Sequence, residues 1–157
     1  DVSVQATVLN LLADLRSQLG LSYLFISHDV SVVACLSDRV VVMFAGRICE
    51  EGRTSAVLLP PYHPYTETLL SAVPGVELAH ARTPRVEASA TQIWDGLGCP
   101  FHLRCPRKLG QVCEAVRPAL TDDGNGHRIA CHIPTADLVS LQVPVLDTRR
   151  ISLKAIA

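Results

Sequence analysis

Four cysteines concentrated between positions 99 and 131 constrain the fold of this 157-residue chain more than any other feature. They stand among prolines and glycines without helical or strand periodicity, so this segment is expected to have little apolar core and to need a cross-link. Five, seven and seventeen residues separate Cys99, Cys105, Cys113 and Cys131 in turn. Three kinds of cross-link remain open: an iron–sulfur cluster, a structural zinc ion, or two disulfide bonds.

The neighbours of these cysteines bear on that choice. The Cys-Pro steps at Cys99 and Cys105 are typical of iron–sulfur ligands, whereas zinc sites usually contain closer cysteine pairs that are absent here. Three histidines of the segment could replace a thiol in a zinc site: His102, His127 and His132. We expect Cys35 and Cys49, which stand apart, to act as small apolar residues without a chemical role.

Before residue 76 the sequence alternates between helical and strand patterns, which indicates an α/β fold. Apolar residues recur at intervals of three and four over residues 2–19 and predict a helix that ends at Gly20. The apolar run of residues 23–26 predicts a strand buried on both faces of a parallel sheet. A short helix to Leu36, a hairpin of residues 39–44 and 47–50, and a helix over residues 65–72 are predicted next.

Composition excludes several classes of protein. With 48% hydrophobic residues the chain is not expected to be disordered throughout, and a net charge of −1 gives no reason to expect nucleic acid as a ligand. The apolar runs are far shorter than the ~20 residues of a membrane-spanning helix, and no signal peptide is evident. The first residue is not methionine, so we expect upstream sequence, and we predict a soluble, cytoplasmic protein.

A histidine at the end of the predicted strand 23–26 is the first candidate functional residue. His28 stands there immediately before a helix, at the edge of open α/β sheets where ligands bind. An imidazole can hydrogen-bond a phosphate oxygen or an attacking water. On this pattern alone, a helix cap formed by Ser27 and Asp29 with His28 in solvent explains the residues at least as well.

Several segments in a fixed order resemble the ATP-binding subunits of ABC transporters, in the half after the second nucleotide-binding motif. These are residues 1–6 (DVSVQA), residues 25–29 (FISHD) and the hairpin of residues 39–48. The resemblance implies that Asp1 is the aspartate at the dimer interface. It also implies that His28 contacts the γ-phosphate of ATP and holds the attacking water.

Two further segments narrow the resemblance to the importers of oligopeptides, dipeptides and, in some members, nickel. Residues 63–74 (HPYTETLLSAVP) look like the helix that follows the ATPase fold, and residues 98–106 (GCPFHLRCP) look like the C-terminal extension. In that family four cysteines are the candidate ligands of a [4Fe–4S] cluster. The resemblance therefore implies a cluster that staples the extension to the ATPase domain, held by Cys99, Cys105, Cys113 and Cys131. Nearby basic residues would offset its negative charge: Arg104, Arg107 and Lys108.

The predicted fold class is α/β, with the trailing half of an ABC-type ATPase domain followed by an irregular, Cys-rich, metal-stapled extension. Residues 1–76 are assigned to the ATPase half, residues 77–137 to the extension and residues 138–157 to a tail or linker. The chain contains no G-x-x-x-x-G-K-[ST] phosphate loop, no family signature sequence and no catalytic carboxylate. By itself this segment is expected to be inactive.

In the intact protein we expect an ATPase that powers peptide import at the cytoplasmic face of the cell membrane, using ATP and Mg²⁺. The expected partners are a second ATPase subunit or half, transmembrane permease subunits and, indirectly, a periplasmic or extracellular solute-binding protein. The rival hypotheses are a stand-alone metal-binding interaction module and a zinc-stapled regulatory fragment, both without ATPase activity.

Overall fold

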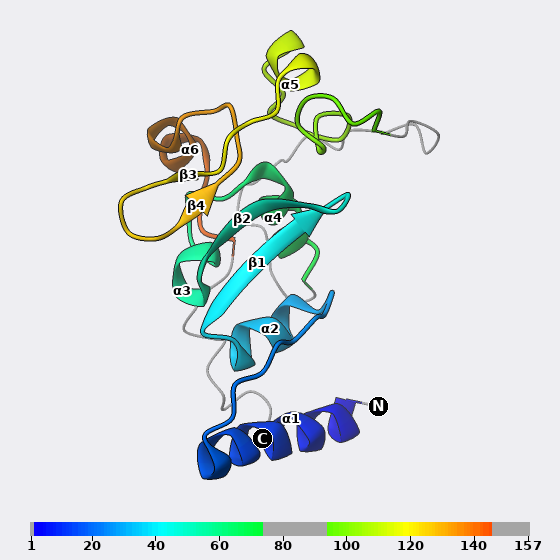
Figure 1. Cartoon of the computed structure of the whole chain (residues 1–157), viewed down its shortest axis with the longest axis vertical. Helices are drawn as coiled ribbons and strands as arrows, with labels where there is room; N and C mark the ends of the chain where they lie inside the picture. The colour runs from blue at the N-terminus through cyan, green and yellow to red at the C-terminus, as the bar shows by residue number, and fades with distance from the viewer. Residues whose placement is uncertain (1, 74–93, 146–157) are drawn as a thin grey trace. The chain divides into compact units, whose positions relative to one another are not determined.

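The computed structural model describes residues 2–73 and 94–145, which form two compact units (Figure 1). The described part of the first unit is residues 2–38, and that of the second is residues 39–73 and 94–145. Asp1 lies outside the described residues, and so do residues 74–93 and residues 146–157. The predicted boundary between the ATPase half and the extension, after residue 76, therefore also lies outside them. In the described ranges, no helix combines the length and apolar character needed to cross a membrane.

The first unit contains helices α1 (Val2–Leu19) and α2 (Val30–Leu36). The predicted helix over residues 2–19 and its end at Gly20 are confirmed, and Gly20 has the positive φ of +63° that glycine adopts without strain. Much of the apolar face that we expected to be covered is exposed, including Val4, Val8 and Leu11. The described residues of this unit therefore do not supply the surface against which such a face packs.

The predicted strand over residues 23–26 is wrong. These residues have no regular secondary structure, and Leu24 and Ile26 are 94% and 90% exposed. A central strand of a parallel sheet is held by hydrogen bonds to two neighbouring strands. All strands of the described residues belong to the second unit, where they pair with one another, so residues 23–26 gain no such bonds.

A hairpin of β1 (Arg39–Phe44) and β2 (Arg47–Arg53) confirms the prediction and extends it by three residues. Ala45 and Gly46 connect the strands with φ of 46° and 73°, the positive values of a two-residue turn that follows the strand twist. Val42 pairs with Glu50 and Met43 with Ile48, so Cys49 is the extra residue of a β-bulge. Its carbonyl accepts a hydrogen bond from Ala130 N–H at 2.8 Å.

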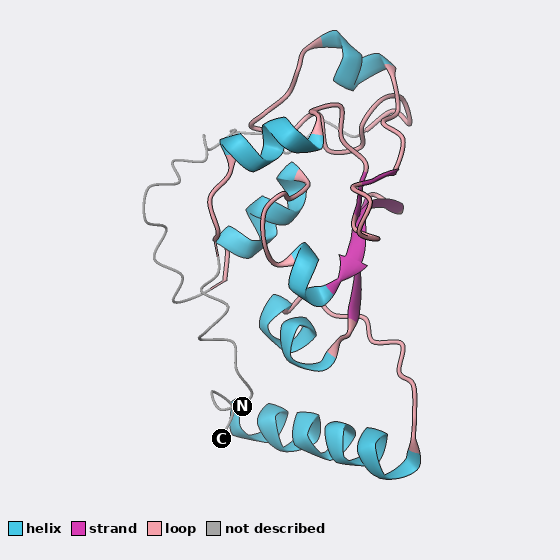
Figure 2. Ribbon diagram, turned by 90° about the vertical axis from the view of Figure 1, so that its left-hand side faces the viewer, coloured by secondary structure: helices cyan, strands magenta, loops and turns pink. Residues whose placement is uncertain are grey.

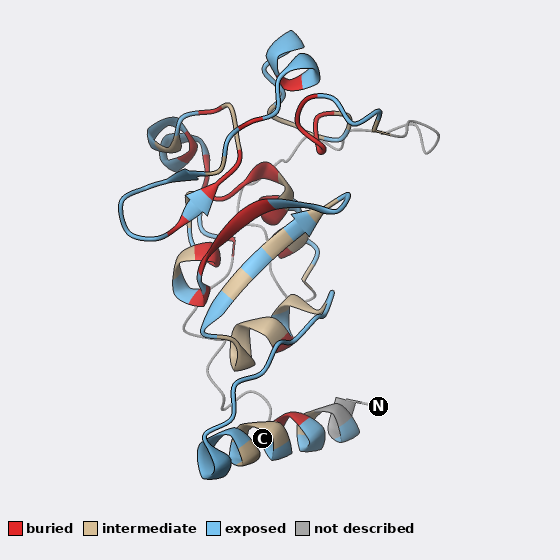
Figure 3. Cartoon of the chain, viewed as in Figure 1, coloured by how far each residue is buried: buried red, intermediate tan, exposed pale blue. Residues whose placement is uncertain are grey.

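Two short strands of the cysteine-rich segment complete the sheet. β3 (Thr121–Asp122) and β4 (Arg128–Ile129) form an antiparallel ladder in the order β1-β2-β4-β3. β2 lies in the predicted ATPase half and β4 in the predicted extension. Because these two strands pair, both predicted segments contribute to one sheet. Figure 3 shows β2 mostly buried, whereas residues along β1 alternate between exposed and half-buried.

The described residues of the second unit form four short helices: α3 (Thr54–Val57), α4 (Pro64–Ser71), α5 (Gln111–Ala115) and α6 (Thr135–Leu141). Figure 2 shows most of them on one side of the strands. The helix predicted over residues 65–72 is confirmed as α4, with Pro64 at its first position. Residue 138 begins the predicted tail, yet it lies within α6, where Leu138 packs with Ile129, Ile133 and Cys131 in a small core. The cysteine-rich segment thus has more core than its sequence pattern predicts.

Candidate functional site

The start of α4 is buried, and it lies in the segment that resembles peptide importers. His63 is 1% exposed and caps the helix, because its Nδ1 accepts the Tyr65 N–H at 3.0 Å. Burial lowers the pKa of His63 to about 4, and a hydrogen bond to the Ala130 backbone opposes this only in part. The ring is therefore neutral at pH 7, and it ties the helix start to the residue before Cys131.

A buried polar network joins α4 to the cysteine-rich segment and to the end of α6. The Glu67 carboxylate accepts two hydrogen bonds from Arg107, at 3.0 Å from Nε and 2.9 Å from Nη2. It also accepts a hydrogen bond from the Gln142 side-chain amide at 3.0 Å. Gln142 in turn bonds both backbone groups of Tyr62, at 2.7 and 3.1 Å. Glu67 raises the pKa of Arg107 through these bonds, so the guanidinium stays charged.

Aromatic rings connect the same three segments. Phe101, between two of the cysteines, lies 5.2 Å from both Phe44 of β1 and Tyr65 of α4, measured between ring centroids. Phe44 and Tyr65 are 4.8 Å apart in an edge-to-face arrangement. Such pairs stabilise a fold by about 0.5–1.5 kcal/mol each beyond the buried area.

A second buried pair anchors the loop between β3 and β4. Glu50, fully buried on β2, accepts a hydrogen bond from His127 Nε2 at 2.7 Å and another from the His63 N–H at 2.9 Å. His127 thereby satisfies a carboxylate in a site that excludes water. The sequence allows His127 as a zinc ligand, but Glu50 engages its Nε2 in the structure.

The four candidate cysteine ligands lie in one electrostatically coupled group. Burial has the largest effect on the pKa of three of these thiols, but a thiolate at Cys113 would also raise the pKa of Cys99, and a thiolate at Cys99 or Cys113 would raise the pKa of Cys131. A thiolate at any of the three other cysteines would likewise raise the pKa of Cys105. The backbones also meet, because Cys99 N–H donates to the Cys113 carbonyl at 2.8 Å. Folding therefore gathers thiols that are up to 32 residues apart in the sequence.

Backbone amides point at every sulfur of this group. The Cys99 sulfur accepts from the N–H groups of Phe101 and His102, and the Cys105 sulfur from that of Arg107. The remaining two sulfurs accept from Leu109, at 3.4 Å from Cys113 Sγ, and from His132 and Ile133 next to Cys131. These bonds stabilise thiolates over thiols and are the interactions that tune iron–sulfur clusters. Two of these donors, Phe101 and Arg107, each stand directly after the proline that follows Cys99 or Cys105. Proline has a fixed φ and no N–H of its own.

Burial dominates the protonation of these thiols. Desolvation raises the pKa of Cys105 to about 12 and that of Cys131 to about 11, and it also raises that of Cys99. The thiols of Cys99, Cys105 and Cys131 are therefore protonated at pH 7, and a metal would have to displace their protons. All six cysteines are free of disulfide bonds.

The geometry around the thiols is looser than that of a loaded metal site. In residues 2–73 and 94–145, no three side chains of Cys, His, Asp or Glu are arranged so that they could hold a metal ion. The chemistry of the donor set nevertheless fits a thiolate-ligated group, because four sulfurs lie together, two of them buried and two half-buried, and each accepts a backbone hydrogen bond. The metal-stapled character of the extension remains a prediction.

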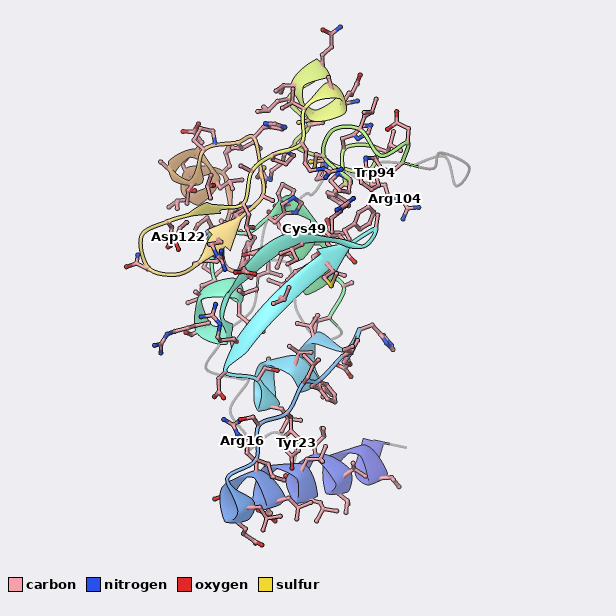
Figure 4. All side chains as sticks on the ribbon, viewed as in Figure 1. Arg16, Tyr23, Cys49, Trp94, Arg104 and Asp122 are labelled. Carbon is pink, nitrogen blue, oxygen red and sulfur yellow. The ribbon has the colours of Figure 1, made fainter. Side chains whose placement is uncertain are left out.

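Cys49 is a site residue that sequence reasoning missed. This buried thiol of the β-bulge is close enough to Cys99 for the charge there to raise its pKa, which burial brings to about 12. Cys49 is labelled on β2 in Figure 4. No spacing rule could have linked Cys49 to Cys99, because a β-bulge and a loop fifty residues later bring them together.

The first unit places His28 in an exposed bend directly before α2. Asp29 caps this helix, because its carboxylate accepts the N–H groups of Ser31 at 2.9 Å and Val32 at 3.3 Å. The Asp29 N–H donates to Ser27 Oγ at 2.9 Å, so the residues on both sides of His28 are fixed. The imidazole itself points into solvent, where it can reach an added ligand. Its predicted role stays a prediction, as does that of Asp1.

Comparison with known proteins supports the resemblance of this chain to the ATP-binding subunits of peptide transporters. The family described as "Oligopeptide/dipeptide transporter, C-terminal region" matches residues 49–113. The dipeptide transport ATP-binding protein DppF of Escherichia coli is 45% identical over 134 residues, and that of Haemophilus influenzae is 44% identical over 134 residues. A probable peptide ABC transporter ATP-binding protein of Sinorhizobium fredii is 42% identical over 135 residues.

These alignments cover most of this chain but a minor part of each relative. They include 83% of the chain for both DppF proteins and 85% for the Sinorhizobium protein. The chain spans only 38–40% of the length of these relatives.

Proposed function

Because the chain belongs with the C-terminal parts of the ATP-binding subunits of oligopeptide and dipeptide ABC transporters, we propose that it is part of an ATP-hydrolysing subunit that powers peptide import. The observation that carries the proposal is the segment that matches the family. Within it, buried His63 and Glu67 at the start of α4 bond to the hairpin and to the cysteine-rich loop, through Glu50 and Arg107 respectively. ATP and Mg²⁺ would be held mainly by residues outside this chain.

Within that subunit His28 would serve the hydrolysis step. Its exposed imidazole, held between the fixed residues Ser27 and Asp29, would hydrogen-bond the γ-phosphate and orient the attacking water. Asp1 would lie at the interface between two ATPase subunits that close face to face on ATP. Closure would act on transmembrane permease subunits at the cytoplasmic face of the membrane, and a solute-binding protein would deliver the peptide.

Substitution of His28 in the intact subunit tests this role. His28→Ala is expected to lower the rate of ATP hydrolysis by about 100-fold or more while ATP binding is retained. Ser31→Ala, which removes an exposed hydroxyl three residues after His28 and leaves the hydrogen bonds around His28 in place, is the matched control and should leave most activity. Unimpaired turnover by His28→Ala would remove the assigned role.

We also propose that Cys99, Cys105, Cys113 and Cys131 hold a [4Fe–4S] cluster, with zinc as the alternative metal. The all-sulfur donor set, the mutual proximity of the thiols and the backbone amides aimed at each sulfur support this assignment. When bound, the group would supply covalent cross-links between the loop of Cys99 and the segment after β4. The chain's own residues would neutralise its charge, with Arg104 exposed beside the loop.

Iron and acid-labile sulfide in anaerobically purified protein measure this directly. We expect about four of each per chain, and a large loss in Cys105→Ser and Cys113→Ser. Cys35→Ser, which removes a thiol from the first unit, is the control and should retain the metal. Zinc in place of iron, or unchanged iron in the Cys105 and Cys113 variants, would refute the cluster.

A further inference from the structure

A small pocket opens in the second unit where the hairpin meets the cysteine-rich segment. Hairpin residues 47–49, His63, Pro100, residues 117–118 and Ala130 line this pocket of about 160 Å³. A single water needs only about 10–15 Å³ by the same measure, so the pocket has room for a group of several oxygen atoms.

The charge of the pocket has one sign. Arg47 and Arg117 are its charged lining residues, and no lining residue among those that the structure describes is acidic. The nearest carboxylate along the chain, on Glu50, is fully buried and bonded to His127 and to the His63 N–H. His63 itself is neutral at pH 7, because burial lowers its pKa to about 4. Two guanidinium groups therefore set a positive potential that no described lining group cancels.

Neither arginine has a carboxylate partner within the described ranges. Arg117 is held in place, because its guanidinium lies 5.9 Å from the centre of the Trp94 ring and donates to the Gly96 carbonyl at 3.3 Å. Trp94 is labelled in Figure 4. The Arg47 side chain, one residue after the hairpin turn, makes no hydrogen bond or ion pair with a described residue. Arg117 is thus held in position at the pocket, whereas the Arg47 side chain is free to move onto a ligand.

We propose that this pocket binds a phosphate group, with Arg47 and Arg117 as its two ligands. A phosphate or phosphomonoester carries about 1.5 to 2 negative charges at pH 7 and presents three or four acceptor oxygens, which match two planar guanidinium forks. A carboxylate matches only one of them. The group can come from inorganic phosphate or from a phosphomonoester. All lining residues of the pocket belong to the second unit, whereas His28 belongs to the first unit.

Hydrogen exchange in the intact subunit tests the proposal, because it reports on backbone amides near the pocket even if phosphate also binds elsewhere. Inorganic phosphate and glycerol phosphate are titrated separately against chloride at constant ionic strength. Protection of amides in residues 44–49 and 94–100 is expected to rise in proportion to 1 + [ligand]/Kd, about tenfold at ten times Kd. Whichever probe acts at the lower concentration identifies the source of the group.

Three variants separate the pocket from general charge effects. Arg47→Gln and Arg117→Gln are each expected to raise Kd by about tenfold or more, and Arg47→Lys to raise it less. Arg39→Gln, which removes an exposed arginine at the far end of β1, is the control and should leave Kd unchanged. Protection that is equal in chloride and in phosphate, or equal in Arg47→Gln and Arg39→Gln, would overturn the proposal.

Discussion

Loss of Arg107 should destabilise the second unit more than loss of any exposed charge. Its guanidinium makes two hydrogen bonds to Glu67 and one to the Leu141 carbonyl at 3.1 Å. The Glu67 side chain is 2% exposed, so Arg107→Met would leave a carboxylate in a site without water. Breaking a buried ion pair costs about 3–5 kcal/mol. Because the Arg107 side chain is 23% exposed and partly screened, we expect a loss of about 3 kcal/mol in the free energy of unfolding.

Urea unfolding followed by the fluorescence of Trp94, the only tryptophan of the chain, measures this loss. The double variant Glu67→Gln, Arg107→Met removes the buried charge as well and should recover at least about 1 kcal/mol relative to additivity. Lys108→Met is the control, because Lys108 pairs with an exposed residue, and its unfolding midpoint should stay close to that of the parent chain. A loss below about 1 kcal/mol for Arg107→Met, or strict additivity in the double variant, would refute the reasoning.

Three further predictions concern the same unit. Burial lowers the pKa of His63 from its ordinary 6.5 to about 4, so the unfolded chain takes up this proton first. The free energy of unfolding should therefore fall by about 3 kcal/mol as pH drops from about 6.5 to about 4, and His63→Gln should flatten that part of the profile measured by urea titration. The buried Thr66 hydroxyl has no hydrogen-bond partner among the residues that the structure describes, so Thr66→Val should leave the free energy of unfolding unchanged or raise it by up to about 1 kcal/mol, whereas a clear loss would reveal a hidden partner. Gly98→Ala should cost about 3 kcal/mol or more, because φ is +61° and the new Cβ would meet the Glu114 carbonyl oxygen. Gly46→Ala, with φ of +73° but open space, should cost only about 1 kcal/mol, and equal thermal shifts for the two would contradict the steric argument.

Local elements were predictable where the sequence carries its own start and stop signals. The hairpin follows from two β-branched runs around Ala45 and Gly46, and α4 from Pro64 with a second proline at position 74. The strand over residues 23–26 failed because a central strand is stabilised by its neighbours rather than by its own residues. β3 and β4 were missed because two residues are too short to show a period.

The sequence by itself determined which residues carry the resemblance to peptide importers, from His28 to the four cysteines, because motif and spacing are local properties of the chain. Tertiary structure alone decided that Glu67 pairs with Arg107 forty residues later and that Cys49 lies beside Cys99. It also decided that Arg47 and Arg117 share one pocket. Each of these is a contact between residues distant in the chain. Such contacts depend on how β2, α4 and the cysteine-rich loop pack, which no local pattern of residues encodes.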